Sequence, residues 1–97
     1  MYYQQGDILI KKTTEIKGEL LNHLTLAKGE ATGHHHTITK GTAKLYDDNG
    51  TLYLSVKEEA QLTHQEHNVV TLPVGDYVVE LVKEYDHFSE EIRNVND

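Results

Sequence analysis

Histidine is concentrated in two short segments of this sequence. Five of the seven histidines lie between Gly33 and Ile38 or between residues 64 and 67, namely His34, His35, His36, His64 and His67. Imidazole is the commonest protein ligand for metal ions and also a general acid or base near neutral pH. The clustering therefore predicts a metal site built from both segments.

The spacing within each segment indicates which imidazoles can converge. If residues 34–40 form a strand, His34 and His36 share one face and His35 lies on the other. His64 and His67 are three positions apart, an odd spacing that places them on opposite faces of a regular strand. They can converge only across a helical turn or a bend.

We predict that His34, His36, His64 and His67 hold one divalent metal ion. Four such ligands complete a tetrahedral structural site, whereas three leave a position for water, as in catalytic zinc sites. Zinc is the first candidate, and iron, manganese and nickel are alternatives with the same ligand types. The competing interpretation is that these histidines are hydrogen-bonded structural residues or solvated surface residues.

Two carboxylates adjoin the histidines in the sequence, Glu30 and Glu66. Each is a candidate metal ligand, partner of a ligand, or general base. As a base acting on metal-bound water, either would support a hydrolytic or lyase-type reaction. The alternative is an exposed carboxylate on an acidic protein, which is the usual state of glutamate.

Composition narrows the class of protein. The 97 residues predict a single domain over 1–97, and the net charge of −7 argues against binding to nucleic acid. There is no cysteine, so disulfides and thiolate zinc sites are excluded. No apolar run approaches the roughly 20 residues that span a bilayer. With no signal peptide in view, we expect a cytoplasmic protein that does not contact membranes.

The elements that must position the histidines read as short strands. Asn49-Gly50 between two strand-like runs is a strong hairpin signal. Gly41 is expected to interrupt a strand, and Lys57–Glu59 is expected to form a charged turn. The segment 19–27 fits a bulged strand or a short helical turn equally well. The other expected strands are Ile8–Ile10, 34–40, 43–46, 51–56, 69–72 and 77–85.

These strands and turns predict an all-β fold, a small antiparallel β-barrel or sandwich of about six to eight short strands. Pro73-Val74-Gly75 supplies a type I turn before the last strand. The acidic tail over 86–97 is expected to be mobile or to form a short C-terminal helix.

Several stretches resemble a group of small bacterial and phage proteins of uncharacterised function. Residues 29–36 look like the group's GEATGHxH stretch, residues 64–67 its HxEH stretch and residues 72–77 its LPxGxY stretch. The similarity covers most of the chain. It implies that His35 is incidental to the pattern, and it implies no particular reaction.

The sequence also shows a partial similarity to cupins, which bind metal through His-x-His on a barrel strand. Gly29 precedes His34 with one residue fewer than in the usual cupin spacing, and no glutamate follows His36 where one is expected. Val78 stands where the second cupin element has a histidine. Convergent ligand geometry is the better description.

The leading prediction is thus a small β-barrel protein that binds a divalent metal through His-x-His and His-x-x-His pairs. One rival is a metal-free protein–protein interaction module, such as a phage or accessory protein, that recognises a protein partner. A small metal-dependent hydrolase or lyase is the other. A homo-oligomer joined through metal sites or exposed strands also remains open.

Overall fold

Two long strands organise the fold. In the computed structural model, which describes residues 2–28 and 35–81, β5 (His35–Asp48) and β6 (Thr51–His64) form an antiparallel hairpin. Asn49 and Gly50 connect them with φ values of 52° and 93°. Positive φ at both central residues defines a type I′ turn, whose twist matches that of the flanking strands. The hairpin predicted at Asn49-Gly50 is confirmed.

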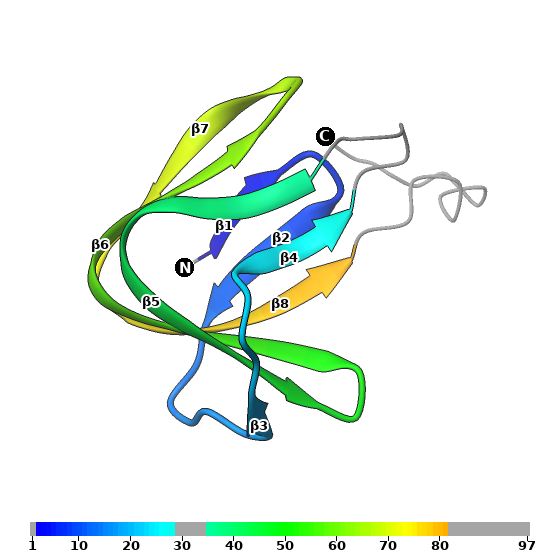
Figure 1. Ribbon diagram of the computed structural model, residues 1–97, viewed down its shortest axis with the longest axis vertical. Helices are drawn as coiled ribbons and strands as arrows, with labels where there is room; N and C mark the ends of the chain where they lie inside the picture. The colour runs from blue at the N-terminus through cyan, green and yellow to red at the C-terminus, as the bar shows by residue number, and fades with distance from the viewer. Residues whose placement is uncertain (1, 29–34, 82–97) are drawn as a thin grey trace.

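Both long strands bend in the middle of their length (Figure 1). The register shifts three times between Ile38 and Ala43, which marks β-bulges opposite β6. Gly41 has a φ of 91°, and a Cβ atom on it would collide with the Glu59 carbonyl oxygen. The chain therefore needs glycine at this point in order to bend without ending the strand.

This bend corrects two predictions. Gly41 does not interrupt the strand, because β5 continues through it by means of the bulges. The expected turn at Lys57–Glu59 lies within β6 instead. A bulged strand contains the same glycine and charged residues that usually mark a loop, which explains both errors.

The remaining strands extend the sheet on both sides of this hairpin. The sheet order is β1-β2-β8-β6-β5-β3, with β4 also paired to β5 and β7 also paired to β6. The first half of β6 pairs with β8, and its second half pairs with β7. These strands are β1 (Tyr2–Gln5), β2 (Ile8–Lys12), β3 (Glu19–Leu20), β4 (Thr25–Lys28), β7 (His67–Leu72) and β8 (Gly75–Leu81).

The curved sheet surrounds one hydrophobic core. Its fully buried members include Ile8 and Ile10 of β2, Leu54 of β6 and Tyr77 of β8. The Tyr77 hydroxyl donates a hydrogen bond to the Pro73 carbonyl oxygen at 2.7 Å, so its polar end is satisfied. The predicted all-β class with antiparallel pairing is confirmed, and the sheet does not close into a barrel.

Smaller differences from prediction concern the ends of strands. β1 was not predicted, and the segment 19–27 contributes parts of two strands, β3 and β4, rather than a helical turn. β2 extends two residues beyond the expected strand Ile8–Ile10, through Lys11 and Lys12. The predicted tail over 86–97 lies outside the described residues.

Candidate functional site

The β6–β7 hairpin brings His64 and His67 together. They are direct cross-strand partners on either side of the two-residue turn Gln65-Glu66. Their ring centroids are 4.5 Å apart. Residues directly opposite each other in an antiparallel pair share a face of the sheet, so the spacing of three, which would separate them in one strand, unites them across a hairpin.

His36 adds a third ring from the neighbouring strand. The pairing of Thr37 with Thr63 places His36 of β5 beside His64 of β6. Their ring centroids are 4.3 Å apart, and the His36 and His67 rings are 6.0 Å apart with planes inclined by only 11°. His36, His64 and His67 thus form a row across three adjacent strands, which we call the histidine row.

Exposure changes along the histidine row. His36 is 1% exposed, His64 is partly buried and His67 is exposed. The burial of His36 and Ile38 on the same side of β5 confirms the predicted alternation of that strand. The histidine row therefore extends from the protein interior to the surface.

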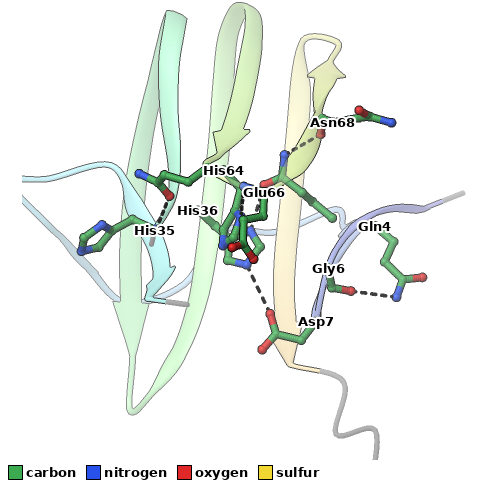
Figure 2. A network of polar contacts seen from close by, with 10 residues as sticks. Gln4, Gly6, Asp7, His35, His36, His64, Glu66 and Asn68 are labelled. Atoms are coloured by element: carbon green, nitrogen blue, oxygen red, sulfur yellow. Dashed lines mark hydrogen bonds and ion pairs between the residues drawn. The ribbon is translucent and has the colours of Figure 1, made fainter. Parts of the chain in front are cut away.

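The other predicted residues are placed as follows. His34 and Glu30 lie outside the described residues. His35 is not part of the histidine row, and its backbone N–H donates to Gln65 Oε1 at 2.8 Å. Glu66 is exposed at the hairpin turn beside His64, and its backbone N–H donates to His64 Nδ1 at 3.0 Å (Figure 2).

Gln5, which the sequence did not single out, holds His36 in place. Its side chain is 2% exposed, and its Nε2 donates to the carbonyl oxygens of Leu62 and Asn68, each at 2.9 Å. These two bonds identify Nε2 as the amide nitrogen, because a carbonyl oxygen only accepts. Gln5 Oε1 lies 2.8 Å from His36 Nδ1, so His36 must donate this bond from Nδ1–H.

Asp7 approaches the opposite nitrogen of the same ring. Its Oδ1 lies 3.2 Å from His36 Nε2 (Figure 2). Between Gln5 and Asp7, Gly6 has a φ of 58°, and a Cβ atom on it would lie only 2.6 Å from His67 Nε2. No local signal in the sequence indicated that the Gly6-Asp7 turn lies against the histidines.

The surroundings of His36 favour its neutral form. Burial is the main cause that lowers its pKa, and the neighbouring His64 lowers it further. Asp7 opposes both by its charge and hydrogen bond, and His67 makes a smaller lowering contribution. Gln5 thus fixes Nδ1 of His36 as a donor, and Nε2 is the ring nitrogen that faces Asp7.

The site holds the ingredients of metal ligation without an assembled ligand group. Within residues 2–28 and 35–81, no three His, Asp or Glu side chains are arranged so that they could jointly hold a metal ion. Imidazole rings in contact with one another and with a carboxylate can still act as ligands after side-chain rotation. They can also exchange protons.

The chain belongs to a family described as a domain of unknown function, DUF8820, whose model matches residues 4–81. The match includes the whole histidine row together with Gln5 and Asp7. No curated protein and no solved structure matches the chain. Over the described ranges, no helix has both the length and the apolar character needed to cross a membrane.

Proposed function

We propose that this protein binds one divalent metal ion, with zinc as the first candidate, through His36, His64 and His67. The observation that carries the proposal is the gathering of three imidazole rings from two distant segments of the chain. Iron, manganese and nickel remain the alternative ions.

The spacing of the rings supports this proposal. With metal–nitrogen bonds of about 2.0–2.1 Å, the ring centroids of tetrahedral ligands lie roughly 5 Å apart. The separations of 4.3, 4.5 and 6.0 Å bracket this value. Small rotations of exposed or partly buried side chains would then suffice to bring the nitrogens onto one ion, because the backbone already sets the distances.

His64 must give up one contact in order to ligate through Nε2. Its Nδ1 accepts from the Glu66 N–H, so Nε2 carries the proton in the neutral ring. Breaking such an exposed hydrogen bond costs about 0.5–1.5 kcal/mol. Structural zinc sites contribute on the order of 10 kcal/mol, so an ion bound with that energy would outweigh the loss of this hydrogen bond.

Two further predictions belong to the same site. His34, two residues before His36, is the predicted fourth imidazole, and it would act from the same face of the strand. A water molecule in place of one ligand would make Glu66 a candidate base for a hydrolytic or lyase-type step. The proposal of metal binding depends on neither.

The test is the metal content of untagged protein, purified without metal-affinity resin and measured by elemental mass spectrometry. We expect about one equivalent of metal in the wild-type protein, lost in a His64→Ala/His67→Ala double variant. Both substitutions change side chains that are not fully buried, so the fold should survive. His35→Ala is the matched control, since its neighbour His36 belongs to the row and His35 does not.

Two results would contradict the proposal. One is wild-type protein that takes up no zinc, iron, manganese or nickel after dialysis against each ion, which would favour the metal-free interaction module. The other is metal retained at full occupancy in the double variant.

A further inference from the structure

Three consecutive residues, the last of β1 and the two of the β1–β2 turn, each contact the histidine row. Gln5 accepts from His36 Nδ1, Gly6 lies against the His67 ring, and Asp7 faces His36 Nε2. This turn comes from the opposite end of the chain to β7, so only the folded protein brings the two together. The turn therefore forms a second wall of the proposed metal site.

Gln5 decides which nitrogen of His36 is available to an ion. Its amide is oriented by two bonds to the Leu62 and Asn68 carbonyl oxygens, so its Oε1 must point toward the His36 ring. Nδ1 of His36 is consequently a donor, so Nε2 is the ring nitrogen that remains for ligation of an ion. Metal-bound histidines are commonly fixed in this manner, by donating the distal N–H to a neighbouring oxygen.

Asp7 lies beside Nε2 of His36, the ring nitrogen that does not contact Gln5. A carboxylate beside this nitrogen favours a cation between the two atoms, which is a proton in the metal-free protein and a metal ion in the loaded protein. The distance from Asp7 Oδ1 to His36 Nε2 is 3.2 Å. Two ligands that are each about 2.0 Å from one tetrahedral zinc ion lie roughly 3.3 Å apart. The spacing of these two atoms thus matches that of neighbouring ligands on one ion.

We propose that Asp7 is the anionic ligand of this metal site and that Gln5 is the positioning residue that selects Nε2 of His36 for ligation. The inference rests on the proposed function, metal binding by the histidine row. Asp7 has a side chain that is 34% exposed, whereas that of His36 is 1% exposed. Asp7 is therefore the member of this pair that contacts solvent.

The ligand set also defines the class of metal. Imidazole nitrogens suit zinc, iron, nickel and copper, and a carboxylate extends the range toward manganese. A mixed set of imidazoles and one carboxylate favours divalent first-row metals over the soft Cu(I) ion. It also disfavours calcium and magnesium, which prefer oxygen ligands throughout.

The test for Asp7 compares Zn²⁺ binding by wild-type protein, Asp7→Asn and Asp48→Asn, measured by isothermal titration calorimetry on metal-free protein. Asparagine keeps the shape of the side chain and removes its charge. Asp48 ends β5 at the β5–β6 turn, so Asp48→Asn removes the same charge far from the histidine row. We expect Asp7→Asn to weaken Zn²⁺ binding about tenfold or more and Asp48→Asn to leave it within about twofold.

The test for Gln5 uses nitrogen NMR of the His36 ring in the metal-free protein. Wild-type protein should show the Nδ1–H tautomer. In Gln5→Met the acceptor for this proton is lost, and the Nε2–H tautomer, which donates to Asp7, should become the major form. A purely structural role for Gln5 would change stability and leave the tautomer unchanged. The visible spectrum of the Co²⁺-loaded protein provides a second readout, which should change in Asp7→Asn if Asp7 is a ligand.

The possible results separate this inference from the proposed function. Wild-type protein that binds no Zn²⁺ overturns both. Tight Zn²⁺ binding that is equal in wild-type protein and Asp7→Asn, with unchanged Co²⁺ spectra, overturns the role of Asp7 and leaves metal binding by histidine standing. An unchanged His36 tautomer in Gln5→Met overturns the positioning role of Gln5, and if that variant fails to fold, Asp7→Asn still tests the ligand.

Discussion

Replacing Gln5 by methionine should destabilise the fold strongly, although the new side chain has nearly the same length. The substitution leaves three polar groups without their partner: the carbonyl oxygens of Leu62 and Asn68 and the Nδ1–H of His36. Two of these bonds are buried and the third is partly buried. An unsatisfied buried group costs about 1–3 kcal/mol, so the expected loss is roughly 3 kcal/mol or more. That is a large part of the ~5–15 kcal/mol that stabilises a typical domain.

The neighbouring residue provides the matched control. Gln4 is exposed, and its side chain makes one exposed hydrogen bond, to the Gly6 carbonyl oxygen. Gln4→Met should therefore change stability by no more than about 0.5 kcal/mol. Urea unfolding followed by circular dichroism measures both variants of the metal-free protein. If Gln5→Met were no less stable than Gln4→Met, the argument that Gln5 ties β1 to the histidine row would be refuted.

Three further predictions concern the same elements. Because the pKa of His36 is lowered in the folded state, its neutral form stabilises the metal-free protein fully above the ordinary pKa of about 6.5. This contribution is lost as the pH falls toward the folded-state pKa. In urea unfolding, the free energy of unfolding should therefore decrease from pH 8 to pH 5, and it should decrease less in His36→Gln. Equal decreases in the two proteins would contradict this prediction. Gly41→Ala should lower the free energy of unfolding by about 1–3 kcal/mol in thermal unfolding, because alanine is strained at a φ of 91° and its Cβ atom meets the Glu59 carbonyl oxygen. An unchanged stability would argue against the bulge. Gly6→Ala places a Cβ atom against the His67 ring, so Zn²⁺ affinity measured by calorimetry should fall, and unchanged affinity would separate the β1–β2 turn from the site.

The strand pattern of this protein was largely readable from local chemistry. Asn49-Gly50 has the residues that a type I′ turn requires, and the period of two correctly placed His36 and Ile38 on the same face of β5. The bend was not readable in the same manner. In the sequence, Gly41 and the charged residues of β6 resemble the ends of strands. Only the pairing of β5 with β6 shows that both strands continue through these positions.

The candidate site could be predicted only in part from the sequence, because its assembly also depends on pairing between strands. The two histidine segments were identified by composition, but the means by which His64 and His67 meet depends on a hairpin at Gln65-Glu66. Neither residue has the positive-φ preference that marks tight hairpin turns, so local sequence gave no hairpin signal. Gln5 and Asp7 carried even less signal, since their contacts with His36 arise only when β1 lies against β7.

The most direct test of the proposed metal site is anomalous X-ray diffraction from crystals grown with Zn²⁺, with data collected on both sides of the zinc absorption edge. The account predicts one strong anomalous peak about 2.0–2.2 Å from ring nitrogens of His36, His64 and His67 and from a carboxylate oxygen of Asp7. A histidine row with no anomalous peak, or zinc bound only elsewhere on the surface, would contradict it.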